Sequence, residues 1–112
     1  MSPRSSSAAL KRSAPVFAAL GDATRLHVVA RLSSEGPLSI TELTEGSEVT
    51  RQAVTKHLEV LSSAGLVVDF RQGRERVWEL KTRQLEEARR TLDAISQKWD
   101  EALERLRMMV EE

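Results

Sequence analysis

Residues 50–61 have the sequence TRQAVTKHLEVL, in which Val54, Leu58 and Leu61 repeat at the spacing of one face of an α-helix. Thr50 can begin this helix by accepting a hydrogen bond from a free backbone amide, and Gly65 can end it. We therefore expect a helix between these two residues, with its apolar face buried in a core.

The opposite face of this helix carries four side chains that can bind DNA: Arg51, Gln52, Thr55 and Lys56. Arginine can donate two hydrogen bonds to a guanine edge, glutamine can pair with adenine, threonine can contact a phosphate or a thymine methyl group, and lysine can bind phosphate. On an arbitrary helix, such side chains more often only keep the surface hydrated. The neighbouring segments are needed to choose between these interpretations.

The segment after Gly65 changes from a helical period to an extended one. Residues 66–70 and 77–80 predict two strands, and residues 71–75 predict a hairpin tip in which Gly73 can adopt a positive φ. Three arginines of this hairpin would lie beside the neighbouring DNA backbone or in the minor groove: Arg71, Arg74 and Arg76.

The segment before Thr50 contains recognisable helix boundaries. Pro15 suits the first position of a helix that ends at Gly21, and Asp22 can cap a second helix. The apolar face expected for this second helix consists of Leu26, Val29 and Ala30.

A short third helix is predicted from near Ile40, because Ser39 and Glu42 have the spacing of a capping box. Residues 46–49 form its exit turn, after which the helix at 51 begins. Two helices joined by a tight turn and followed by a hairpin are the order of a winged helix-turn-helix. The fold class expected is therefore mainly α with a small β-hairpin wing, arranged as four helices, two strands and a fifth helix.

The fifth helix is expected over about residues 82–110, because Thr82 to the end of the chain contains no glycine or proline. Its apolar residues alternate spacings of three and four, which is a heptad seam. They are Leu85, Ala88, Leu92, Ile95, Trp99, Ala102, Leu106 and Met109. A domain of this size has little to cover such a seam, so we expect it to meet a second copy, the first helix, or both.

Composition restricts the possible functions. The chain has 112 residues, a net charge of zero and no cysteine, which excludes a disulfide scaffold, a thiolate metal site and a cysteine nucleophile. Residues 50–83 carry seven basic and four acidic side chains, whereas residues 84–112 carry five and eight. No apolar run is long enough to span a membrane, so a cytoplasmic protein is expected. We expect residues 1–13 to be a disordered basic arm and residues 14–112 to form one DNA-binding and dimerisation domain.

Three segments in this order resemble the arsenic-repressor-like (ArsR) family of winged-helix transcriptional regulators. They are ALGDATRL at residues 19–26, RQAVTKHLEVL at 51–61 followed by AGLV at 64–67, and GRERVWEL at 73–80. The resemblance covers about residues 14–110. It implies a homodimer built on the first and last helices that binds double-stranded DNA at an inverted-repeat operator and usually represses transcription. The interface residues would be Val16, Phe17, Leu20, Leu92, Ile95, Trp99 and Leu106.

The chain differs from metal-sensing members of that family, which use thiolates near the recognition helix or histidine and carboxylate sets on the last helix. It contains no cysteine, and its last helix has no histidine. Glu86, Asp93 and Glu101 are expected to be a solvated acidic face. The Trp99-Asp100 and Ala102-Leu103 pattern resembles a metal-independent branch, so we expect no metal site and no cofactor.

Two other function classes compete with a DNA-binding regulator. An enzyme is not expected, because the sequence has no nucleophile paired with a histidine in a recognisable motif and no glycine-rich phosphate loop. The alternative is a winged-helix interaction module with a coiled-coil seam and no DNA binding. Such a module would not need three wing arginines beside Arg51 and Lys56. No motif in the sequence indicates a particular operator, target gene or small-molecule inducer.

Overall fold

Local capping sets the start of three of the helices in the computed structural model, which describes residues 3–111. The Asp22 carboxylate accepts from the Arg25 amide at the start of α2 (Ala23–Glu35), and the Thr50 hydroxyl accepts from the Ala53 amide at the start of α4 (Arg51–Ser63). Ser39 and Glu42 form the expected capping box of α3 (Ile40–Thr44). These three predicted starts are confirmed.

The first helix is longer than the sequence suggested. Helix α1 spans Pro3–Leu20, so Pro15 lies inside it, and the expected disordered arm is wrong for residues 3–13. The physical reason is tertiary: the Arg12 guanidinium pairs with the Glu87 carboxylate, and the hydroxyls of Ser13 and Thr91 lie 3.0 Å apart in a buried contact with the last helix. Residues 1 and 2 of the expected arm lie outside the described residues.

The predicted hairpin forms, but its strands extend further than expected, because residues 71, 72 and 75 of the expected tip pair in the ladder; the sheet also gains a third strand. Strands β2 (Val67–Gln72) and β3 (Glu75–Leu80) pair antiparallel around a tip at which Gly73 has φ 66°. A two-residue strand, β1 (Leu38–Ser39), pairs with the other edge of β3, so the sheet order is β1-β3-β2. The fold class expected from the sequence is confirmed, with β1 as an addition too short to produce a detectable period.

The core lies where α1, α2, α4 and the sheet meet. Leu58, Leu61 and Leu66 are fully buried, and Trp78 fills the space beside them. Helix α2 presents a different face from the one predicted: Val28, Val29 and Leu32 are buried, whereas Leu26 is 54% exposed and Ala30 is also exposed. The cause is that α2 is apolar on more than one side, and packing against α4 and β3 selects the buried side.

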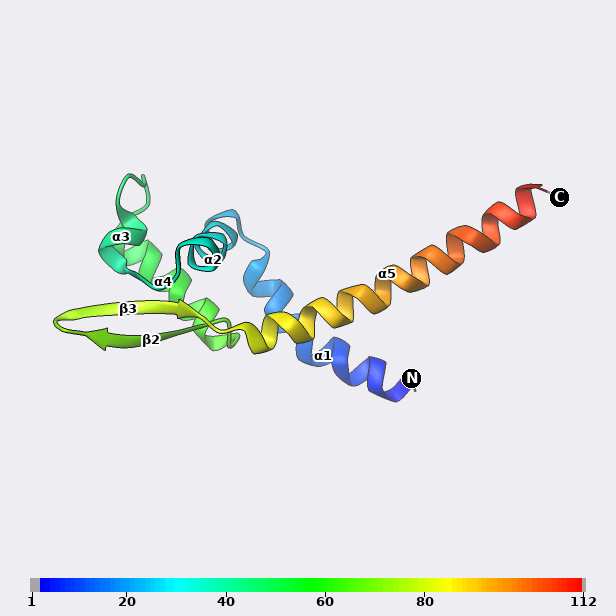
Figure 1. Ribbon diagram of the computed structural model, residues 1–112, viewed down its shortest axis with the longest axis horizontal. Coiled ribbons are helices and arrows are strands. Elements are labelled where there is room, and N and C mark those ends of the chain that lie inside the picture. The colour runs from blue at the N-terminus through cyan, green and yellow to red at the C-terminus, as the bar shows by residue number, and fades with distance from the viewer. Residues whose placement is uncertain (1–2, 112) are drawn as a thin grey trace.

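Helix α5 (Thr82–Glu111) crosses α1 near its own start and then continues away from the rest of the molecule (Figure 1). The hairpin tip and the end of α5 lie at opposite ends of a molecule 67 Å long. Neither α5 nor any other helix between residues 3 and 111 has a stretch apolar enough to cross a bilayer.

Gly65 provides a test of the junction between α4 and β2. It has φ 78°, and a Cβ atom there would lie 2.9 Å from Cγ of Gln84. Gly65→Ala is expected to lower the free energy of unfolding by about 1–2 kcal/mol, because a left-handed conformation is unfavourable for L-residues. Urea denaturation at a fixed protein concentration would measure this destabilisation.

Gly21→Ala is the matched control for that substitution. Gly21 has no positive φ, and its added Cβ would meet backbone oxygens at 3.4 and 3.5 Å, which is ordinary contact. We expect its stability to stay within about 0.5 kcal/mol of the parent. Equal destabilisation of the two variants would contradict the argument from backbone conformation.

Candidate nucleic-acid interface

Helix α4 presents the surface expected of a recognition helix. Val54, Leu58 and Leu61 hold it against the core, which turns Arg51, Gln52 and Lys56 outward into solvent. The exposed side is a shallow concavity lined by Thr50, Arg51, Gln52, Ala53, Thr55, Lys56 and Glu59. The structure therefore brings the four predicted residues of this helix onto one surface.

The four side chains on this surface differ in how firmly they are held. The Thr55 hydroxyl donates to the Arg51 carbonyl at 2.8 Å, and Nη1 of Arg51 donates to the Thr41 hydroxyl at 3.3 Å. Within residues 3–111, no hydrogen bond joins the side chains of Gln52 or Lys56 to the protein. Gln52 and Lys56 can therefore bind an external partner without breaking an internal contact.

Glu59 is a member of this surface that sequence reasoning missed. It lies one turn beyond Thr55 and Lys56, is exposed, and lines the same concavity. A carboxylate there repels phosphate and can accept from the amino group of cytosine. Its position at i+4 from Thr55 is a signal that could have found it, because that spacing places both on one face.

The wing separates its arginines into two kinds. Arg71 and Arg74 are exposed, whereas Nε of Arg76 donates to the Asp69 carboxylate at 2.6 Å and its guanidinium lies 4.6 Å from the centre of the Trp78 ring. The hydrogen bond from Arg76 lowers the pKa of Asp69. Arg71 faces Arg76 directly across the two strands, so pairing with Asp69 also relieves the repulsion between them.

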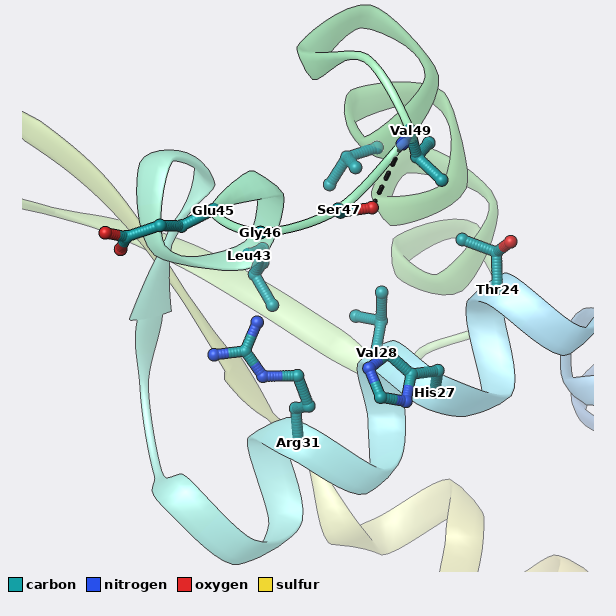
Figure 2. Close-up of a pocket in the computed structure, with 10 residues that line it drawn as sticks. Thr24, His27, Val28, Arg31, Leu43, Glu45, Gly46, Ser47 and Val49 are labelled. Carbon is teal, nitrogen blue, oxygen red and sulfur yellow. Dashed lines mark hydrogen bonds between the residues drawn. The ribbon is translucent and has the colours of Figure 1, made fainter.

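A hollow of about 290 Å³ lies between α2 and the turn that leads into α4 (Figure 2). Arg31 crosses beside it from α2: Nη1 donates to the Glu42 carbonyl at 3.1 Å, while the rest of the guanidinium pairs with Glu35. Within the turn, the Val49 amide donates to the Ser47 hydroxyl at 3.0 Å. The Arg31–Glu42 bond ties α2 to α3, and the Val49–Ser47 bond orders the turn between α3 and α4.

The seam of α5 is buried at its beginning and exposed along the rest of its length. Ala88 packs in the core, but Leu92 is 54% exposed, Ile95 37% and Trp99 65%, and Leu106 is also exposed. Phe17 on α1 is exposed as well, and Leu20 is partly buried. Val16 does not belong to this surface, because it is 1% exposed in the core of its own chain, so its assignment to a dimer interface is wrong.

The described residues offer no evident metal site. Between residues 3 and 111, no three histidine, cysteine, aspartate or glutamate side chains gather closely enough to hold an ion. Glu86, Asp93 and Glu101 are all exposed on α5.

Comparison with known proteins identifies the family. A family model described as a helix-turn-helix domain matches residues 20–69. The HTH-type transcriptional regulator Rv2034 of Mycobacterium tuberculosis is 42% identical over 85 residues, which cover 76% of this chain and 76% of the relative. The solved structure of an ArsR-like transcriptional regulator from Rhodococcus sp. RHA1 matches with a TM-score of 0.73 at 34% identity, over 88% of this chain and 92% of that one.

The chain belongs to the ArsR-like family of helix-turn-helix transcriptional regulators. A further ArsR-like structure, from Mycobacterium bovis, is described as a homodimeric winged helix-turn-helix DNA-binding domain; it matches with a TM-score of 0.62 at 25% identity, over 94% of this chain and 93% of that one. The match extends over nearly all of this regulator, α5 included. The resemblance inferred from residues 19–26, 51–67 and 73–80 is confirmed, and a DNA-binding transcriptional regulator follows from it.

Proposed function

We propose that this ArsR-like regulator represses transcription by binding an inverted-repeat operator as a homodimer. The observation that carries the proposal is the pairing of an exposed polar recognition surface on α4 with an exposed apolar seam on α5. A two-fold dimer presents two recognition helices at matched faces of the duplex. The half-site centres are then expected about 10 base pairs apart, or a multiple of that distance.

The residues proposed to contact DNA have separate tasks. Arg51, Gln52 and Thr55 are proposed to meet base edges in the major groove, and Lys56 to meet phosphate. Arg71 and Arg74 are proposed to meet the neighbouring backbone from the wing. Arg76 acts on binding through the shape of the wing, since its guanidinium is already paired with Asp69. This role needs no cofactor and no enzymatic activity, and we expect the regulator to act on the chromosome in the cytoplasm.

Selection of genomic fragments by the purified regulator tests the proposal. Fragments retained at increasing salt are sequenced, and their common motif is examined for two-fold symmetry. We expect an inverted repeat, together with an affinity that falls linearly in log-log form as salt rises. Retention of direct repeats would contradict the proposal. Retention of no fragment at all would also contradict it and would favour a protein-interaction module.

The Asp69–Arg76 pair predicts a substitution that strengthens DNA binding. Asp69→Asn removes the carboxylate that neutralises Arg76 and frees a third wing cation for phosphate. Affinity is expected to rise several-fold, and the magnitude of the salt slope to rise by about one for each wing. Fluorescence anisotropy titrations at several salt concentrations would measure both quantities.

Glu75→Gln is the control for Asp69→Asn, because it removes one negative charge from the same hairpin without a described ion pair. A general effect of net charge would raise affinity equally in both variants. If the substitution acts by releasing Arg76, the rise in affinity should be larger in Asp69→Asn than in Glu75→Gln. Equal rises would show that Arg76 is not held back by Asp69.

A further inference from the structure

The side chain of Arg25 lies where α1, α2 and α4 meet. Its Nε donates to the Ala19 carbonyl in the last turn of α1 at 2.6 Å, and its Nη1 lies 3.3 Å from Nδ1 of His57 in the middle of α4. The Asp22 carboxylate accepts from the Arg25 amide at 3.0 Å and lies 3.8 Å from the same imidazole nitrogen. One guanidinium thus joins the end of α1 to the recognition helix.

The chemistry of this contact fixes its direction. A guanidinium has only donors, so Nδ1 of His57 is the acceptor in this contact. Asp22 supplies the compensating negative charge, and its pKa is lowered by the Arg25 amide and then by the charge of Arg25. The side chains of Asp22, Arg25 and His57 form a half-buried group, in which the negative charge of Asp22 offsets the positive charge of Arg25.

The position of this group relates it to the dimer proposed above. Helix α1 packs against α5 and carries the exposed Phe17, whereas α4 carries Gln52 and Lys56. Apolar packing of Val16 and Ala19 sets how closely α1 approaches the core, but such packing is non-directional. The hydrogen bonds of Arg25 are directional, so they can fix the angle of α4 relative to α1.

We propose that Arg25 and His57 are positioning residues that hold the recognition helix at a fixed angle to the dimer-forming helices, and so set the operator spacing that the dimer accepts. This inference rests on the proposed function. Neither residue needs to touch DNA for this role. Loosening the link lets each α4 turn on its own scaffold, so that half-sites at altered spacing are bound with less penalty.

The test compares operators that differ only in spacing. Duplexes carrying the selected inverted repeat, and versions lengthened or shortened by one base pair, are titrated with the parent, Arg25→Ala, His57→Leu and the double variant. The parent is expected to bind the selected spacing more tightly than the altered ones. The ratio of its affinity for the selected spacing to its affinity for an altered spacing is the discrimination ratio. This ratio should fall about tenfold in each single variant, because each removes a hydrogen bond to a charged group. The double variant should fall no further, since both substitutions break one link.

The spacing ratio separates positioning from mere stability. Partial unfolding lowers the concentration of active protein equally for every duplex, so it cancels from the ratio. His57→Asn keeps an acceptor near the place of Nδ1 and is expected to restore the discrimination that is absent in His57→Leu. Arg25→Lys keeps the charge and the aliphatic stem but cannot bond Ala19 and His57 together, so it should resemble Arg25→Ala even if the alanine variant fails to fold.

His27→Ala is the matched histidine control. His27 lies on the exposed side of α2, and no hydrogen bond of its side chain is present in the described part of the chain. The inference would be overturned if Arg25→Ala and Arg25→Lys kept the discrimination ratio of the parent. It would also be overturned if the ratio fell equally in His27→Ala. A parent that binds none of the duplexes would instead overturn the proposed function, so the two failures are distinguishable.

Discussion

Replacing Ile95 and Trp99 together by glutamate is expected to give monomers and to abolish operator binding. Both side chains lie on the exposed part of the α5 seam, where a second copy would bury them. An unpaired charge in such an interface costs about 3–5 kcal/mol, and the two-fold axis brings four new carboxylates together. Sedimentation velocity would measure the mass, and a mobility shift with the selected operator would measure binding.

The control for this variant changes charge equally on the other side of α5. Gln97→Glu with Arg90→Gln alters the net charge by the same amount, and both positions lie about 160° around the helix from the seam. This variant should remain dimeric and bind the operator. If the Ile95/Trp99 variant also remains dimeric, the interface lies elsewhere and the exposed seam has another occupant.

Gln52→Ala and Arg74→Ala are expected to weaken DNA binding in different ways. Gln52 is exposed on the first turn of α4 with no internal hydrogen bond in the described structure, so its removal should change the preferred base at one position of each half-site. The expected cost at that position is about 1–3 kcal/mol. Scrambled DNA should be bound as before.

Arg74→Ala should instead weaken binding to operator and scrambled DNA alike. Arg74 is exposed at the hairpin tip, and removing its phosphate interaction should lower the magnitude of the salt slope by about one for each wing, or two per dimer. Arg76→Ala provides an internal comparison, because its guanidinium is already paired with Asp69 and its slope should change less. An unaltered slope in Arg74→Ala would remove the wing from the DNA interface.

Features set by neighbouring residues were predictable from the sequence. The caps at Asp22, Ser39 and Thr50 and the turn at Gly73 depend on side chains and glycines within a few positions, so their signals are local. The buried face of α4 was also predictable, since its apolar residues occupy one side only. These elements were enough to place the predicted DNA-binding residues on two exposed surfaces, one on α4 and one on the hairpin.

Features that depend on distant partners were not predictable. The extension of α1 before Pro15 requires Glu87 and Thr91 of α5, and β1 exists only because β3 offers a free edge. The engagement of Arg76 required the strand register that brings Asp69 opposite Trp78. A run of arginines in a hairpin shows charge, but not which of them is already neutralised.

The exposed length of α5 has a consequence for how the amount of protein controls its action. The helix extends about 45 Å, and only its first turns, around Ala88 and Thr91, are covered by its own chain. We expect freshly synthesised single chains to be inactive until they meet. At protein concentrations below the dissociation constant of the dimer, the dimer concentration varies with the square of the total protein concentration. Halving synthesis then lowers the occupancy of an unsaturated operator about fourfold. Such a regulator would respond to its own abundance more steeply than in direct proportion, without requiring a bound effector.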